Sequence, residues 1–230
     1  MIALEGVTIV AQSGIRILDA VDLRIGAAEV YALVAERPTP LSMVIDALLG
    51  FSKPQTGSIS VLGYSAGAQA MDVRRVITAI RAPSGFEPHL TVRANIELLM
   101  RLAGHAAPRT DAIDAALRES DIPDRRFDAA AGTLMPFEQR AVWLAVARLR
   151  GTTVLLCDDP TVGLNESEAA RLGLVIRDLA AAGPAALVAT HDAEFARAVA
   201  DRGGILDNGR LVLEWSRNEL PVPAPGWFHG

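Results

Sequence analysis

The sequence contains a single cysteine, Cys157, so no disulfide framework can support the fold. Basic residues are outnumbered: 22 lysines and arginines stand against 27 aspartates and glutamates, which gives a net charge of -5 and no basic footprint for nucleic acid. The sequence also lacks a run of about eighteen apolar residues, which a membrane-spanning helix would need. Its first ten residues lack the basic n-region of a signal peptide. These absences favour a cytoplasmic protein that binds no nucleic acid.

The sequence does contain enough apolar material for a substantial core. Half of its 230 residues are hydrophobic (50%), which suits one large domain or two closely packed lobes. Cys157 lies within the apolar run Thr153 to Cys157, and we therefore interpret it as a buried strand residue rather than a reactive thiol.

Short apolar runs alternate with helical periodicity along much of the chain. Strands are expected at Leu4 to Val10, Glu29 to Ala35, Ser58 to Leu62, Val76 to Ile80, Val154 to Cys157, Ala186 to Thr190 and Gly204 to Leu206. This alternation predicts an α/β fold with a largely parallel central sheet. Gly57-Ser58 and Asn208-Gly209 are expected to form hairpin turns.

The stretch from Thr91 to Leu149 differs, because helical periodicity dominates it. Apolar residues recur at three- and four-residue spacing in Val92 to Ala103, Thr110 to Ser120 and Phe137 to Arg148. We therefore expect an α/β core at residues 1–88 and 150–220, with a helical subdomain at 89–149 inserted in it. The tail at 221–230 is rich in proline and glycine and is expected to be irregular.

The segment Tyr31 to Phe51 lies where a phosphate-binding loop would be expected, between an apolar strand and an amphipathic helix. A working P-loop reads G-x-x-x-x-G-K-[ST]: its glycines let backbone N–H groups converge on phosphate, its lysine contacts the outer phosphates, and its hydroxyl ligates magnesium. The corresponding positions are Ala35, Pro40, Leu41 and Ser42. Leu41 carries no charge, and Pro38 and Pro40 have no N–H to donate. Only Ser42 keeps the chemistry of the motif.

The residues before the helix suggest how this turn is built instead. Thr39 is expected to act as N-cap and Pro40 to occupy the first helical position, so that the helix can begin without an anion. An ordinary strand-to-helix turn that never held a nucleotide is the alternative. Glu36 adds negative charge at this point, whereas Arg37 could supply some positive charge.

The most specific segment of the chain is Thr153 to Asn165, TVLLCDDPTVGLN. It resembles the Walker B strand and D-loop of ATP-binding-cassette (ABC) transporter nucleotide-binding domains, which read as four apolar residues, Asp-Glu, Pro-Thr and then Gly-Leu-Asp. The resemblance implies that Asp158 would help to hold magnesium and that Asp159 would orient the attacking water. Asp159 is one methylene shorter than the glutamate usual there.

Further landmarks of this family follow in order and cover nearly the whole chain. Ala189 to Asp192 resembles the switch segment, in which His191 would contact the outer phosphate. Leu90 to Asn95 resembles the start of the helical region, Gly57 to Gly63 the early hairpin, and Asp207 to Leu211 the closing hairpin. The resemblance implies an ABC-type ATPase fold: a P-loop-like parallel sheet core, N-terminal antiparallel strands and an inserted helical subdomain.

The departures from the family pattern are concentrated where its members contact nucleotide. Ala11 replaces the aromatic ring that stacks on adenine, and Ala82 replaces the glutamine of the Q-loop. The signature loop, usually Leu-Ser-Gly-Gly-Gln, reads Leu134-Met135-Pro136-Phe137-Glu138. With the P-loop also degenerate, Asp158, Asp159 and His191 are interpreted as relics of a catalytic site.

The resemblance and the departures together predict a degenerate, non-hydrolysing subunit of an ABC transporter with a structural or regulatory role. No cofactor is expected; if Mg-ATP were retained, Ser42 and Asp158 would hold the metal. One alternative is an ATPase that still binds or slowly hydrolyses ATP through a non-standard loop, using Ser42, Asp158, Asp159 and His191. The other is a soluble scaffold without a role in transport.

The partners implied by the resemblance are transmembrane permease subunits and either an intact cassette or a second copy of this chain. The helical region and the cleft around Ala82 to Leu90 would contact the membrane subunit from the cytoplasmic side. In this family two domains pack head to tail, with each ATP between the P-loop of one and the signature loop of the other. Because both loops are altered here, both composite sites of such a dimer would be impaired.

Overall fold

A computed structural model of the chain describes residues 1–36, 38–82 and 85–217. The strands are β1 (Ile2–Val10), β2 (Arg16–Ile25), β3 (Val30–Ala35), β4 (Thr56–Val61), β5 (Tyr64–Ser65), β6 (Ile77–Ile80), β7 (Val154–Asp158), β8 (Ala185–Thr190), β9 (Arg202–Asp207) and β10 (Arg210–Ser216). The α-helices are α1 (Ser42–Leu48), α2 (Ala70–Val76), α3 (Val92–Leu102), α4 (Thr110–Glu119), α5 (Pro136–Leu149), α6 (Glu166–Ala181) and α7 (Ala193–Val199). Short 3-10 turns at Asp124–Arg126 and Ala131–Thr133 lie between α4 and α5.

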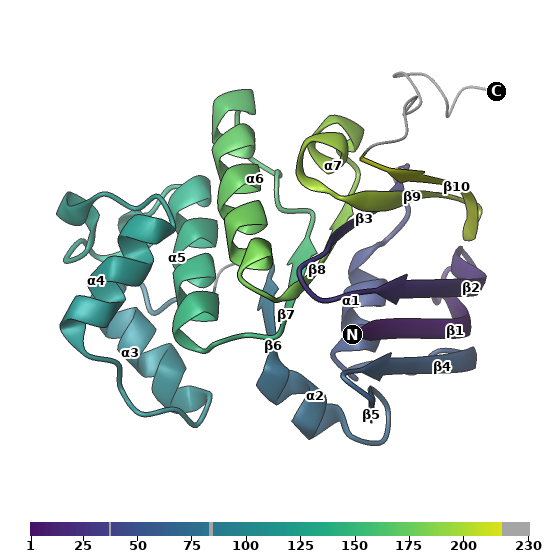
Figure 1. Cartoon of the computed structure of the whole chain (residues 1–230), viewed down its shortest axis with the longest axis horizontal. Helices are drawn as coiled ribbons and strands as arrows, with labels where there is room; N and C mark the ends of the chain where they lie inside the picture. Colours follow the sequence, from purple (N-terminus) through teal and green to yellow (C-terminus); the bar gives the residue numbers. More distant parts are fainter. Residues whose placement is uncertain (37, 83–84, 218–230) are drawn as a thin grey trace.

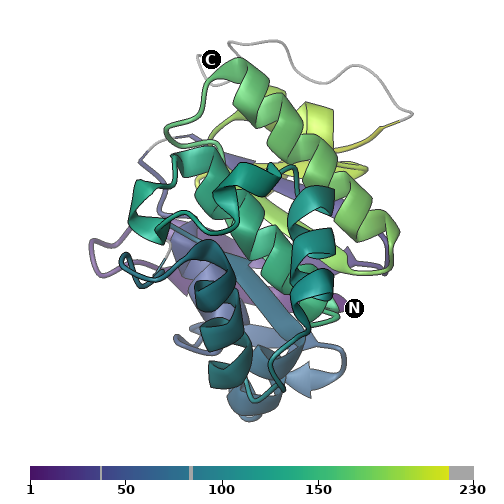
Figure 2. The ribbon, with the colours of Figure 1, turned by 90° about the vertical axis from the view of Figure 1, so that its left-hand side faces the viewer.

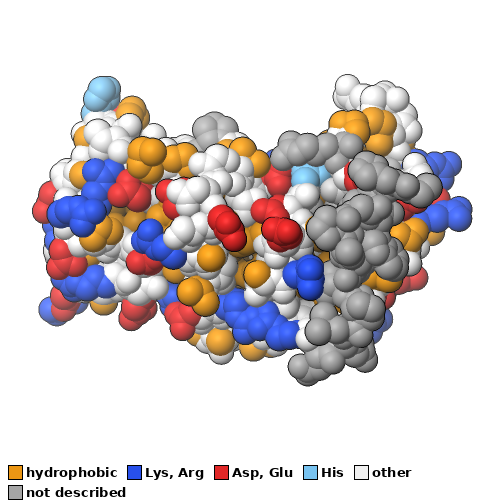
Figure 3. Space-filling view, turned by 90° about the horizontal axis from the view of Figure 1, so that it is seen from above, with side chains coloured by type: hydrophobic (Ala, Val, Ile, Leu, Met, Phe, Trp, Pro, Cys, Tyr) orange, Lys and Arg blue, Asp and Glu red, His pale blue; other side chains and the backbone are white. Residues whose placement is uncertain are grey.

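Six strands form the central sheet in the order β10-β9-β3-β8-β7-β6. The neighbours from β9 to β6 run parallel, and only β10 is antiparallel to its partner β9. Every residue of β3 and of β8 is buried, as expected for parallel strands that are covered on both faces. The carboxyl ends of β6, β7 and β8 point to the upper side of Figure 1, which is the face seen in Figure 3. The predicted α/β architecture with a largely parallel core is confirmed.

A second sheet holds the N-terminal strands in the order β2-β1-β4-β5, and its strands pair antiparallel. Gly57 and Ser58 lie inside β4, so the prediction of a hairpin turn at these residues is wrong. Gly57 has a φ of 82°, and a Cβ there would come within 2.4 Å of the carbonyl oxygens of Glu5 and Gly6. A close approach of two strands therefore requires this glycine. The turn itself falls between β4 and β5, whereas Asn208 and Gly209 do connect β9 to β10.

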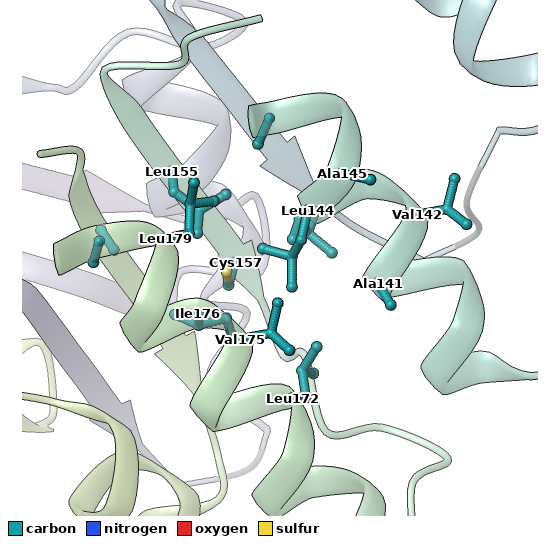
Figure 4. Close-up of a cluster of buried hydrophobic side chains, with 14 of the residues drawn as sticks. Ala141, Val142, Leu144, Ala145, Leu155, Cys157, Leu172, Val175, Ile176 and Leu179 are labelled. Atoms are coloured by element: carbon teal, nitrogen blue, oxygen red, sulfur yellow. The ribbon is translucent and has the colours of Figure 1, made fainter. Parts of the chain in front are cut away.

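Two buried clusters pack on opposite faces of the six-stranded sheet. One joins β7 to α5 and α6, where Cys157, Leu155, Leu144 and Ile176 meet (Figure 4). The other lies on the opposite face of the same sheet and joins it to α1 and the antiparallel sheet, through residues such as Leu156 and Ile45. Cys157 is fully buried, and burial raises its pKa to about 12, as expected for an unreactive core thiol.

Helices α3, α4 and α5 stand together beyond the β6 edge of the sheet (Figures 1 and 2). Asn95 of α3 is buried and fixes the entry to this region, because its amide donates to the carbonyl oxygens of Glu87 and Leu90 and accepts from the N–H of Glu87. Thr91 caps α3 by accepting from the N–H of Ala94 at 3.2 Å. Among the described residues, no helix is long and apolar enough to span a membrane.

Candidate functional site

The side chain of Leu41, in the turn between β3 and α1, points into the core. Leu41, which stands at the position of the P-loop lysine, is only 3% exposed and packs in the core beneath α1. Ser42 is the first residue of α1 and is half-buried, and Ala35 ends β3 in a fully buried position. Lys53, the only lysine of the sequence, lies exposed in the loop after α1. No lysine therefore takes the place of the missing one.

Two backbone donors of this turn are used within the turn itself. The N–H of Thr39 donates to Glu36 O and that of Leu41 donates to Thr39 O, both at 2.9 Å. Pro38 and Pro40 have no N–H. The prediction of Thr39 as N-cap with Pro40 as the first helical residue is wrong: α1 begins at Ser42, and its cap position is Leu41, which makes no side-chain hydrogen bond. Arg37 lies outside the described residues.

An ion-pair network occupies the carboxyl ends of β6 and β7. Asp158 ends β7, and its Oδ2 lies 3.1 Å from Nε of Arg81, the residue that follows β6. Nη1 of Arg81 lies 2.6 Å from Oδ1 of Asp46, which belongs to α1. Burial raises the pKa of Asp158 above its ordinary value; Arg81 opposes this rise, and Asp159 and Asp46 add to it. One guanidinium is thus shared by two carboxylates.

Asp159, which follows β7, is bonded to the end of the neighbouring strand β8. Oδ1 of Asp159 accepts hydrogen bonds from Thr190 Oγ1 and from the backbone N–H of His191, both at 3.2 Å. Nδ1 of His191 lies 2.7 Å from the carbonyl oxygen of Ala35. Because a carbonyl can only accept, Nδ1 must carry the proton and donate to it. The ring is thereby tied to the end of β3.

The segment that resembles a signature loop forms the start of α5. Met135 is 61% exposed, Pro136 is the first helical residue, and Phe137 is buried with its ring under the guanidinium of Arg171. Glu138 accepts from the N–H of Met135 at 2.9 Å and pairs with Arg126 at 2.7 Å. The N–H of Met135, at the start of the helix, is therefore already bonded to a carboxylate of the same helix. An external anion at this helix N-terminus would have to compete for that donor.

Ala11 and Ala82, which stand at the family's positions for an aromatic ring and a glutamine, lie in different surroundings. Ala11 packs as a small, partly buried residue against the antiparallel sheet. Ala82 lies directly after Arg81 and lines a cavity of about 290 Å³ together with Pro136 and Trp143. A larger cavity of about 560 Å³ lies beside the β3–α1 turn. Its lining includes two acidic residues, Glu36 and Asp207, and the basic residue Arg16.

A third hollow lies on another face, between α2, α3 and α5, and has a volume of about 510 Å³. Met71 (64% exposed), Leu102 (75% exposed) and Trp143 are among the residues that line it. The ring of Trp143 stacks on that of Phe86, with 5.7 Å between the ring centroids. The basic residues of the hollow are Arg74, Arg75 and Arg150. We call this hollow the α2–α5 groove.

The residues at the sheet edge do not fit a magnesium ion. Magnesium binds in proteins through one or two carboxylates together with water. Here Oδ2 of Asp158 already pairs with the positive charge of Arg81, and Oδ1 of Asp159 accepts from Thr190 and from the N–H of His191. In the described ranges, no group of three or more histidine, cysteine, aspartate or glutamate side chains could hold a metal ion. Sequence reasoning identified Asp158 but missed Arg81 and Asp46. The strand order could have revealed Arg81. Parallel pairing of β6 with β7 sets Ile80 opposite Cys157, and the residues that follow them, Arg81 and Asp158, therefore lie close together.

Comparison with known proteins agrees with the order of motifs. The family profile described as "ABC transporter" matches residues 18–162. The Nod factor export ATP-binding protein I of Burkholderia orbicola (strain AU 1054) is 27% identical over 204 residues, which is 89% of this chain and 67% of that protein. The same protein of Rhizobium etli is also 27% identical, with 65% of its length matched. The chain thus spans about two thirds of the length of these relatives.

Solved structures with the same fold include ABC cassettes. A dimeric bacterial ABC transporter cassette, MJ0796, superposes with a TM-score of 0.81 at 21% identity, covering 96% of this chain and 100% of that one. CbiO1 from Clostridium perfringens, part of the transporter complex cbiONQ, superposes with a TM-score of 0.80 at 18% identity, covering 94% and 88%. The ABC-type fold predicted from the motifs is confirmed, and the chain belongs to the ABC transporter family.

Proposed function

We propose that this chain is a non-hydrolysing subunit of an ABC transporter, with a structural or regulatory role and no resident Mg-ATP. The observation that carries this proposal is the buried side chain of Leu41, which fills core space at the position of the phosphate-binding lysine. The self-bonded turn at Thr39 and Leu41 and the closed ion pair at Asp158 support it.

The size of the expected loss in ATP affinity supports the same proposal. A charge-assisted hydrogen bond contributes about 1.5–3 kcal/mol, and each 1.4 kcal/mol changes affinity about tenfold. Losing the lysine together with the donors at Pro38 and Pro40 therefore weakens binding by several orders of magnitude. Hydrolysis suffers further, since phosphoryl transfer depends on positive charge held close to the transferred group.

The rival proposal is that ATP still binds through Ser42, Asp158, Asp159 and His191. Calorimetric titration of the purified chain with ATP and magnesium separates the two. We expect no heat of binding at micromolar concentrations. Micromolar binding that is lost in Asp158→Ala would defeat our proposal. Asp72→Ala, a change at a partly exposed residue of α2, serves as the control for non-specific effects.

We further propose that residues 1–88 and 150–220 act as the core and 89–149 as the helical subdomain, and that the chain binds a transmembrane permease on its cytoplasmic side. The α2–α5 groove, with Met71, Leu102 and Trp143, is the surface that suits such a contact. Leu102→Asp should abolish co-purification with the permease. Leu174→Asp is the matched control, because Leu174 of α6 is 68% exposed and lies outside the groove.

The second cassette in such an assembly would be an intact ATPase or another copy of this chain. The relatives and the cassette MJ0796 are named for export, ATP binding and dimer formation, which supports both possibilities. Affinity purification from native membranes followed by identification of partners tests them together. Recovery of this chain without any integral membrane protein, in repeated trials, would favour the soluble scaffold instead.

A further inference from the structure

We propose that Arg81 is a built-in counter-ion that takes the place of a divalent cation at the carboxyl edge of the sheet. The metal implied by the family does not fit this edge because the arginine is already there. Arg81 pairs with Asp46 at 2.6 Å and with Asp158 at 3.1 Å. The same side chain therefore closes the site that a metal would need and links α1 to the ends of β6 and β7.

The position of Arg81 follows from the strand register. Ile80 and Cys157 are paired in the parallel ladder of β6 and β7, so Arg81 and Asp158 both lie one residue beyond a paired position. Asp46 follows Ser42 by four residues on α1, which places both on the same side of that helix. Without Arg81, Oδ1 of Asp46 and Oδ2 of Asp158, which both contact its guanidinium, would border the space that it leaves. These are the hard oxygen ligands that magnesium and manganese prefer.

The charges at this edge explain why an arginine suits it. Asp46 and Asp158 carry two negative charges, and Asp158 is the more deeply placed, with its side chain 15% exposed. Each carboxylate needs a positive partner to offset the cost of its burial. The fork of a guanidinium can donate to two carboxylates at once, which an ammonium or a neutral side chain does less well. Arg81 supplies that partner permanently, with no ion taken from solution.

Removal of Arg81 should have different effects on cation binding in two cases: a purely structural ion pair, and a counter-ion that excludes metal. If Arg81 only held three elements together, its removal would lower stability and create no affinity for cations. If it stands in for a cation, its removal should expose an oxygen site. The inference shares its location with the proposed function, but its test contains no nucleotide. A chain that bound ATP would overturn the proposed function and leave the cation result to be judged separately.

The experiment measures binding of Mn²⁺ alone to the full chain, by calorimetry and by the electron paramagnetic resonance signal of free Mn²⁺. Wild-type protein should bind no Mn²⁺ at this edge. Arg81→Ala should bind one Mn²⁺ with a Kd on the order of 10⁻³ M, the range of weak oxygen-ligand sites. At about 10 mM Mn²⁺ this binding should raise the folding equilibrium constant of the variant about tenfold. Adding Asp158→Asn to the variant should abolish both effects.

Matched variants keep the test decisive. Arg75→Ala removes an arginine that pairs with Asp72 on the exposed face of α2, and it should gain no Mn²⁺ binding. If Arg81→Ala does not fold, Arg81→Gln retains most of the side-chain volume and should show the same gain. Wild-type protein that binds Mn²⁺ in an Asp158-dependent manner would overturn the inference. Folded Arg81 variants that bind no more Mn²⁺ than wild type would overturn it as well.

Discussion

Glu138 and Arg126 form an ion pair with two contacts at the first turn of α5, one of them 2.7 Å between Arg126 Nε and Glu138 Oε1. Both side chains are largely shielded, and Glu138 also accepts from the N–H of Met135. The carboxylate is therefore bonded both to the first turn of α5 and to Arg126.

We expect Glu138→Gln to lower the free energy of unfolding by about 1–2 kcal/mol, because a charge-assisted bond and a favourable helix-end charge are both lost. Urea unfolding measures it. Glu119→Gln is the control, since Glu119 is 61% exposed and lies 3.7 Å from Arg148; such a pair contributes less than about 1 kcal/mol. Equal effects of the two changes would contradict the role assigned to Glu138.

Restoring the missing lysine should not restore nucleotide binding. Leu41→Lys would place a charge in a site that is 3% exposed, and should cost about 3 kcal/mol of stability. Leu41→Met, which keeps the apolar volume, should cost less than about 1.5 kcal/mol. Thermal or urea unfolding and ATP calorimetry measure both consequences. A stable Leu41→Lys protein with micromolar ATP affinity would show that the site is closer to function than we propose.

Gly203 of β9 lies directly opposite Trp215 of β10 and leaves room for its ring. A Cβ at this position would come within 2.1 Å of Cζ2 of that ring. Gly203→Ala should therefore destabilise the protein by about 1–3 kcal/mol through overpacking. Gly67→Ala, which meets no atom within 4 Å, should be close to neutral.

A double-mutant cycle tests the cause of that cost. In a Trp215→Leu background the alanine at position 203 should be tolerated better, which gives a coupling energy of about 1 kcal/mol. Additive effects of the two changes would show that the ring is not the obstacle.

The acid stability of the helical region should depend on Asp114. Its pKa is held below the ordinary value of 3.8, first by hydrogen bonds from Arg93, whose Nε lies 2.7 Å from it. A lowered pKa in the folded state means that the pair stabilises the fold above pH 3.8 and that this contribution is lost as the pH falls through the lowered pKa.

Asp114→Asn should therefore reduce stability at neutral pH and flatten its fall between about pH 5 and pH 2. Urea unfolding across that range measures this. Asp72→Asn removes the partner of an exposed arginine pair at 3.5 Å and should leave the slope unchanged. An unchanged slope in Asp114→Asn would contradict the assignment.

Several strands were predictable because they are buried on both faces and therefore read as continuous apolar runs. Val154 to Cys157 and Ala186 to Thr190 coincide with β7 and β8 to within one residue. β2 escaped detection because its alternation is interrupted. Ala20 has a positive φ of 53°, and the pairing of β2 with β1 shifts register more than once. Such a strand shows no simple period-two pattern.

The candidate site shows a different limit of sequence reasoning. The loss of the lysine and of the loop donors could be inferred from Leu41, Pro38 and Pro40, because each residue type lacks the required group. The start of α1 could not, because a backbone turn at Thr39 forms before the helix and displaces the expected cap. Nor could Arg81 be found, since its partners lie 35 and 77 residues away and meet it only through the sheet.

The bond from His191 to the carbonyl of Ala35 has a consequence for how the molecule could work in a cell. It fastens the end of β8 to the end of β3 with protein atoms alone. In the non-hydrolysing subunit that we propose, a backbone carbonyl holds the imidazole where a phosphate would otherwise hold it. The ends of these two strands should then keep the same separation whether or not nucleotide is present.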